Sequence, residues 1–124
     1  MRNGILLLLT VVLYACGSND SIDYYNTAQE KLKEKNYTEA LNDFEKFVSD
    51  NPGNELAPNA LFEIAKIYHS ESITGLTKDE SLSKAVFFYK RVFYEYKKSN
   101  LAEQALFVAA FIQANELDKF DEAK

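Results

Sequence analysis

The sequence predicts an all-α fold of antiparallel helix pairs, and three observations lead to that prediction. The 124 residues include two prolines and four glycines, which favours helices over a β fold with its many turns. Apolar residues recur at i, i+3, i+4 and i+7, the spacing of one face of a helix. The apolar pattern also returns at a constant offset of 45 residues, so the helices are expected to repeat.

The clearest predicted helix covers about residues 38–49. Ala40, Phe44 and Phe47 lie on one face of it. The small alanine allows a neighbouring helix to approach closely, and the two rings fill the space beside it. Pro52 ends the helix, because proline lacks the amide donor and clashes with the preceding turn.

An earlier helix is expected over about residues 21–35, and Asn36-Tyr37 form the tight turn after it. Ser21 or Asp20 is a suitable N-cap, because its side chain can accept from a free amide of the first turn. The face of this helix is expected to carry Tyr24, Ala28 and Leu32.

Three more helices and the start of a sixth are expected further along the chain. The third begins near Ala57 or Pro58 and ends near His69, with an apolar stripe of Leu61, Ile64, Ala65 and Tyr68. A loop over residues 71–80 precedes the fourth, which covers about 81–97 and carries Ala85, Tyr89 and Val92. The fifth covers about 101–117 and carries Leu106, Ala109 and Ala110; a sixth begins at Asp118.

The internal repeat is visible residue by residue. The offset of 45 pairs the face of the second helix with Ala85, Tyr89 and Val92 of the fourth. It also pairs Ala57, Ala60, Leu61, Phe62 and Ala65 with Ala102, Ala105, Leu106, Phe107 and Ala110. Within each helix pair, the small residue of the first helix precedes that of the second helix. The separation is 12 residues from Ala28 to Ala40, 20 from Ala65 to Ala85 and 13 from Ala110 to Ala123. The middle pair therefore carries an insertion of about seven residues between its helices.

This order of turn, small residue, aromatic residues and proline resembles a tetratricopeptide repeat (TPR), a helix–turn–helix of about 34 residues. The resemblance covers residues 21–124 as about two and a half units, and it implies a right-handed superhelix, an α–α solenoid. Because Lys124 falls within the sixth helix, we expect the sequence to be truncated at this end. The alternative is that Asp118–Lys124 is a tail on a five-helix protein.

The first twenty residues resemble a bacterial lipoprotein leader. Arg2 provides a short positive region, and residues 5–13 form an apolar stretch too short to span a bilayer comfortably. Leu13-Tyr14-Ala15-Cys16 is similar to a lipobox, which implies a signal peptide over 1–15, lipid on Cys16 and a tether over 16–20. In lipoproteins of enteric bacteria, an aspartate directly after the lipidated cysteine retains the protein at the inner membrane. By that resemblance, Gly17 favours the outer membrane. The alternative is an ordinary signal peptide with an incidental cysteine.

Composition argues against most kinds of chemistry. The net charge is −5 with no basic cluster, which disfavours binding to nucleic acid. One cysteine and one histidine exclude the usual zinc ligand sets. We find no nucleophile–base pair and no glycine-rich phosphate loop, and His69 fits a helix end better than a catalytic role. We therefore expect no enzyme activity, no cofactor, no metal and no small-molecule substrate.

The TPR resemblance implies that the first helix of each pair lines a concave groove that binds a protein or peptide. The groove residues are then Tyr25, Gln29 and Lys33, followed by Phe62, Lys66 and His69, and finally Phe107 and Phe111. Aromatic rings with a few polar groups suit a peptide or an apolar helix. The alternative is that Phe62 and Phe107 only pack between adjacent helices.

The leader and the repeats together look like the outer-membrane assembly lipoproteins of the BamD/YfiO type, and like the periplasmic TPR partner of the Tol-Pal system (YbgF type). The resemblance implies a non-catalytic scaffold that is lipid-anchored at the periplasmic side of the outer membrane. Its partner would be an envelope protein, and its role outer-membrane assembly or envelope maintenance. Two alternatives are the auxiliary TPR part of a larger envelope enzyme, and a soluble TPR module that is periplasmic or secreted.

Overall fold

The computed structural model describes residues 20–117, which contain helices and no strand. The all-α prediction is confirmed for this part of the chain. The elements are α1 (Asp20–Lys33), α2 (Tyr37–Asp50), α3 (Ala57–His69), α4 (Lys78–Glu95), α5 (Ala102–Ile112) and a π-helical turn, η1 (Gln113–Leu117). The predicted signal peptide, the lipid site at Cys16 and the sixth helix at Asp118 lie outside the described residues.

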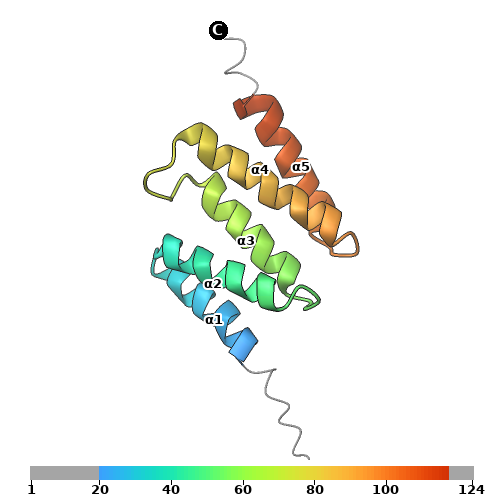
Figure 1. The fold of residues 1–124 in the computed structure, drawn as a ribbon. Coiled ribbons are helices and arrows are strands. Elements are labelled where there is room, and N and C mark those ends of the chain that lie inside the picture. The colour runs from blue at the N-terminus through green and yellow to red at the C-terminus, as the bar shows by residue number, and fades with distance from the viewer. Residues whose placement is uncertain (1–19, 118–124) are drawn as a thin grey trace, which may run out of the picture.

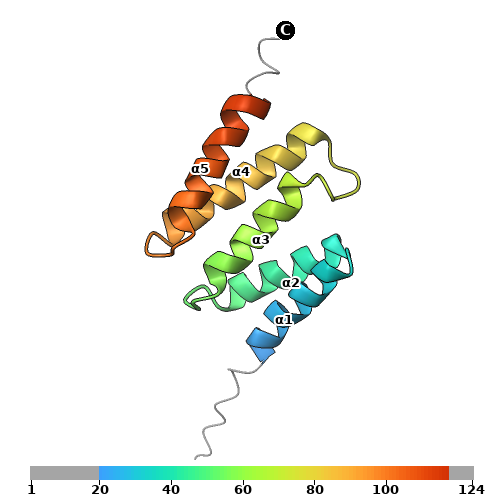
Figure 2. The same ribbon diagram turned by 180° about the vertical axis from the view of Figure 1, so that it is seen from behind.

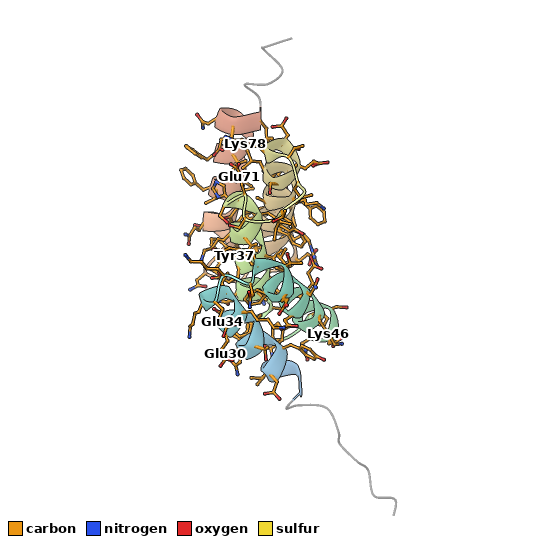
Figure 3. The ribbon with its side chains drawn as sticks, turned by 90° about the vertical axis from the view of Figure 1, so that its left-hand side faces the viewer. Glu30, Glu34, Tyr37, Lys46, Glu71 and Lys78 are labelled. Carbon is orange, nitrogen blue, oxygen red and sulfur yellow. The ribbon has the colours of Figure 1, made fainter. Side chains whose placement is uncertain are left out.

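The helices follow one another in a zigzag, each packed against the next along the chain (Figure 1). The view from behind shows the same order from α1 to α5 (Figure 2). Seen from the side, α1 lies beside α2 and α5 beside α4 (Figure 3). Apart from η1, which also contacts α4, the substantial contacts all join consecutive helices.

The predicted face of α2 is buried, as expected. Ala40, Phe44 and Phe47 have no exposed surface, and the matched face of α4 is equally closed at Ala85, Tyr89 and Val92. The predicted stripe of α3 is also buried along its length. Burying each large side chain of this kind contributes about 1.5–3 kcal/mol to folding, so these faces hold the helix pairs together.

The helix α4 begins at Lys78, three residues before the predicted start at Ser81. The reason is a capping box. The Thr77 hydroxyl accepts from the Glu80 amide at 3.2 Å, and the Glu80 carboxylate accepts from the Thr77 amide at 2.8 Å. The extra residues of the middle pair thus supply a longer loop and an added first turn of α4.

The fifth helix differs most from its prediction. The α-helix ends at Ile112 and continues as η1, and of the predicted face only Ala109 is buried, while Leu106 is half-buried and Ala110 exposed. The buried residues of α5 are Ala102, Ala105, Ala109 and Ile112. Because α5 packs against α4 with this side, and nothing within residues 20–117 covers the other, the Ala110 side stays open.

The repeat extends to the backbone of the loops between pairs. The α2–α3 loop begins with a hydrogen bond from the Asn51 amide to the Phe47 carbonyl at 2.9 Å. The α4–α5 loop begins with the equivalent bond from Tyr96 to Val92 at 3.1 Å. The N-cap residues that follow, Leu56 and Leu101, have nearly equal dihedrals (φ −87° and −88°, ψ −6° and −11°). The offset of 45 is therefore a structural repeat as well as a sequence repeat.

Candidate protein-interaction surface

The predicted groove residues of α1 include one that packs inside its own helix pair. The Tyr25 ring lies 5.7 Å from the Phe44 ring and 5.3 Å from the Phe47 ring, between ring centroids. Gln29 donates from its Nε2 to the Tyr25 hydroxyl at 3.2 Å, and Lys33 is exposed. Tyr25 thus joins α1 to α2, and Gln29 and Lys33 lie on the more open side of α1.

The predicted residues of α3 divide in the same way. Phe62 packs edge-to-face on Tyr89 of α4 with centroids 5.1 Å apart, and the His69 ring lies 6.1 Å from the same tyrosine. Burial of Tyr89, with the nearby Glu63 carboxylate, raises its pKa to about 12. Lys66 is exposed, and its Nζ lies 3.0 Å from the Glu63 carboxylate.

The predicted residues of α5 are the most exposed aromatic side chains of the set. Phe107 is 72% exposed and Phe111 is 51% exposed. Within residues 20–117, no other ring pairs with either of them. An exposed large apolar side chain gains free energy when a partner buries it, and several such side chains on one surface mark an interaction site.

The residues at equivalent positions of α1, α3 and α5 form three rows. We call Tyr25, Phe62 and Phe107 the inner row, because each stands three residues before the small residue of its helix. We call Ala28, Ala65 and Ala110 the small row. We call Gln29, Lys66 and Phe111 the outer row, because each directly follows the small residue.

The rows face different surroundings. Tyr25 and Phe62 of the inner row contact the next helix, which is the packing role that the sequence left open for Phe62. The outer row faces solvent: Lys66 and Phe111 are exposed, and Gln29 is partly so. Six of the eight predicted residues therefore fall into an inner row, of which Tyr25 and Phe62 pack on other helices, and a solvent-facing outer row. Lys33 and His69 belong to neither row, so the eight do not form one uniform groove.

A loose cluster of acidic and basic side chains lies where α3, α4 and η1 meet. Glu116 lies 3.7 Å from His69 Nε2 and 3.9 Å from Lys78 Nζ, and Lys78 lies 4.0 Å from Glu71. The labelled Glu71 and Lys78 are neighbours in the side view (Figure 3). Exposed pairs of this length contribute at most about 1 kcal/mol, so the cluster adds little to the stability of the fold.

One cavity of the described surface was not predicted from the sequence. A cavity of about 890 Å³ lies between the two equivalent loops, with Pro52, Pro58, Tyr94 and Tyr96 among its lining residues. None of the eight predicted residues lines it. The offset of 45 matches Asn51 with Tyr96, so the repeat itself could have indicated that these loops lie side by side.

Two further observations bear on the kind of site. Within the described residues, no group of three or more His, Cys, Asp or Glu side chains is placed to hold a metal ion. None of the helices in that range is both long and apolar enough to cross a membrane.

Comparisons with protein-family models, with curated proteins and with solved structures found no match for this chain.

Proposed function

We propose that this protein is a non-catalytic, TPR-like scaffold that binds another protein of the bacterial envelope. In this proposal it is held to the periplasmic side of the outer membrane by lipid on Cys16. Its role is outer-membrane protein assembly or envelope maintenance. The helix pairs form a short α–α solenoid, and α1, α3 and α5 are the first helices of its units.

The observation that carries the proposal is the outer row. One side chain from each of the alternate helices α1, α3 and α5 is directed away from the packed faces: an amide, an ammonium and a phenyl ring. Each stands directly after a small residue, and the backbone repeat supports the equivalence of the α3 and α5 positions. A repeat that places a different side chain at the same solvent-facing point of each unit favours recognition of an extended partner.

The chemistry of the row favours a protein partner. Phe111 offers an aromatic anchor, the kind of residue that dominates interface energies. Lys66 offers a positive charge that is held only by an exposed pair with Glu63, so an acidic group of a partner can compete for it. Gln29 can exchange its bond with Tyr25 for one to a peptide backbone.

The proposal is tested by fractionation and capture in a bacterial host with an outer membrane. The wild-type chain should incorporate labelled palmitate and sediment with membranes, whereas Cys16→Ser should do neither. The lipidated wild type should then recover an envelope protein that the matched chain with Phe111→Ala recovers less well.

Two results would count against the proposal. If the wild type takes up no palmitate, the lipid anchor is wrong. If Phe111→Ala and an exposed substitution elsewhere, Asn42→Ala, recover the same proteins equally well, the outer row is not the binding surface.

A further inference from the structure

The helices α2 and α4 form the same kind of ion pair at equivalent positions. On α2, Lys46 Nζ lies 2.8 Å from the carboxylate of Asp50. On α4, Arg91 Nε lies 2.8 Å from the carboxylate of Glu95, and the offset between the two pairs is again 45 residues. The repeat therefore extends to the outer side of these helices, so their solvent-facing positions can be compared one by one.

The positions around these pairs differ in chemical kind between the two helices. Four exposed residues of α2 are acidic or polar, namely Glu39, Asn42, Glu45 and Ser49. Their counterparts on α4 are basic or aromatic, and we call them the basic face: Lys84, Phe87, Lys90 and Tyr94. Of its two rings, Phe87 is 58% exposed and Tyr94 is 60% exposed. Since α2 folds with polar residues at the same places, the fold itself does not require rings there.

The charge of this part of the chain is opposite to that of the whole. Residues 84–98 contain five basic side chains and one acidic one, whereas the chain has a net charge of −5. The acidic residue, Glu95, is already paired with Arg91. The other four cations form no ion pair within residues 20–117, and they are Lys84, Lys90, Lys97 and Lys98. They are interleaved with apolar residues, so their concentration at one helix was not expected from the sequence.

The basic face leads along α4 to the cavity between the two loops (Figure 1). Tyr94, Lys97 and Lys98 line this cavity of about 890 Å³. Pro52 of the α2–α3 loop and Pro58 at the start of α3 also line it. Rings and prolines can accommodate an apolar side chain, and the lysines beside them can pair with carboxylates. The face and the cavity together therefore suit an extended ligand that has both kinds of group.

An acidic peptide fits this surface better than an anionic bilayer or a second copy of the chain. The field of a bilayer reaches about 10 Å at 0.1 M salt, so it would also act on the acidic remainder of the molecule. A peptide contacts the basic face alone. The acidic side of α2 in a second copy carries Asn42 and Ser49, which are too polar to cover Phe87 and Tyr94.

We propose that the basic face of α4 and the adjoining cavity bind an acidic peptide segment of a partner protein. Apolar side chains of the peptide cover Phe87 and Tyr94, and its carboxylates pair with the lysines. This site is separate from the outer row, which lies on α1, α3 and α5, so either can fail while the other holds.

A library of random peptides displayed on phage tests which ligands the surface selects. Selection on the full chain should enrich peptides that combine aspartate or glutamate with leucine, phenylalanine or tyrosine. The strongest of them is then synthesised with a fluorescent label, and its Kd is measured by anisotropy. Replacing its acidic residues by the corresponding amides should weaken binding by about ten-fold at low salt.

The variants of the protein copy residues of α2 onto α4. Phe87→Asn combined with Tyr94→Ser should weaken the peptide by about ten-fold at any salt concentration, because the apolar cover is lost. Lys90→Glu should weaken it by a similar factor at low salt and by less at high salt. Both should keep the wild-type Tm, because α2 folds with these residues at equivalent positions. The matched control is Lys35→Glu, which makes the same change of charge in the exposed turn between α1 and α2.

Each of five results would overturn the inference. The first is a selection that enriches no acidic peptides. The second is an equal Kd for Lys90→Glu and Lys35→Glu, which would show that the peptide does not lie on α4. The third is a loss of peptide binding in Phe111→Ala, which would place the peptide on the outer row.

The remaining two results would assign the basic face to another occupant. Binding to phosphatidylglycerol vesicles that Lys90→Glu abolishes, with no peptide selected, would assign the face to a bilayer. A dimer in sedimentation that Lys90→Glu dissociates would assign it to a second copy of the chain.

Discussion

The hydroxyl of Tyr96 donates a hydrogen bond of 2.7 Å to the carbonyl oxygen of Pro52. The two residues belong to the two equivalent loops, one at the end of each helix pair. The bond therefore joins the second pair to the first, in addition to the contacts between α2 and α3. Both residues also line the cavity between the loops, whose shape depends on the distance between them.

Removal of this bond should loosen the junction between the pairs. Tyr96→Phe keeps the ring and deletes only the donor, so we expect a loss of about 0.5–1 kcal/mol in the free energy of unfolding. Urea denaturation measures this value. The matched control is Tyr94→Phe, because Tyr94 is 60% exposed, and it should change the midpoint little. The same midpoint for both variants would show that the bond contributes nothing in solution.

A charge in the packed contact between α1 and α2 should be far more damaging. Ala40 is fully buried between α1 and α2, so Ala40→Asp places a carboxylate there without a partner and should cost about 2–5 kcal/mol. Asn42→Asp adds a charge of the same sign on the exposed face of α2 and should cost much less. Thermal melting followed by circular dichroism compares them. A similar fall in Tm for both would contradict the observed register of α2.

The buried Tyr89 predicts a specific loss of stability at alkaline pH. Its pKa in the folded protein is raised to about 12, above the ordinary tyrosine value of about 10. A raised pKa stabilises the fold below the ordinary value, and this contribution is lost as pH rises toward the folded pKa. Between these values stability should fall by about 1.4 kcal/mol per pH unit from this group alone. Tyr89→Phe should show a shallower decline in denaturation curves from pH 9 to 11.5.

The capping box of α4 predicts an effect at the opposite end of the pH scale. The Thr77 amide and hydroxyl lower the pKa of Glu80, in that order of importance. Its stabilising contribution is therefore present above the ordinary glutamate pKa and lost as pH falls through the lowered one. Glu80→Gln should be less stable than the wild type at pH 7, and the difference should shrink as pH falls through the lowered pKa of Glu80. A difference that stays constant with pH would show that the carboxylate charge has no part in the cap.

The outer row predicts how a partner's affinity should respond to mutation. Phe111→Ala should weaken binding by about 1–2 kcal/mol, five- to thirty-fold in Kd, with an unchanged Tm. Lys66→Glu should slow association at low salt and have a smaller effect at high salt, because exposed charges are screened. Asn42→Ala, on the exposed face of α2, is the control and should bind normally. Titration of each variant against the captured protein measures the Kd. Normal binding by both Phe111→Ala and Lys66→Glu would exclude the outer row as the binding surface.

Much of the fold follows from the sequence because the apolar spacing has one dominant period. The faces of α2, α3 and α4 could be predicted, since each is a regular stripe of small and aromatic residues that ends in a turn. The start of α4 was misplaced because Thr77 and Glu80 act through a local hydrogen-bonded cap, which an apolar pattern does not reveal.

The candidate site was harder to predict because both rows of aromatic and polar residues lie at helical spacing. Nothing in the local sequence distinguishes Phe107 from Phe111, and only the contacts of their counterparts Phe62 and Lys66 do so. Ala110 was expected to be buried like Ala65, because burial of a helix face depends on the helix that follows it. The cavity between the loops was missed because it is formed by residues about 45 positions apart.

The zigzag order of the helices has a consequence for how the molecule opens. Since each helix is held mainly by its neighbours in the chain, a terminal helix can detach while the others keep their contacts. Amide hydrogen exchange should therefore form a gradient, slowest in α3 and the adjoining halves of α2 and α4, and fastest in α1 and α5. Under mechanical force applied to either end of the helical array, we expect the helices to detach one at a time.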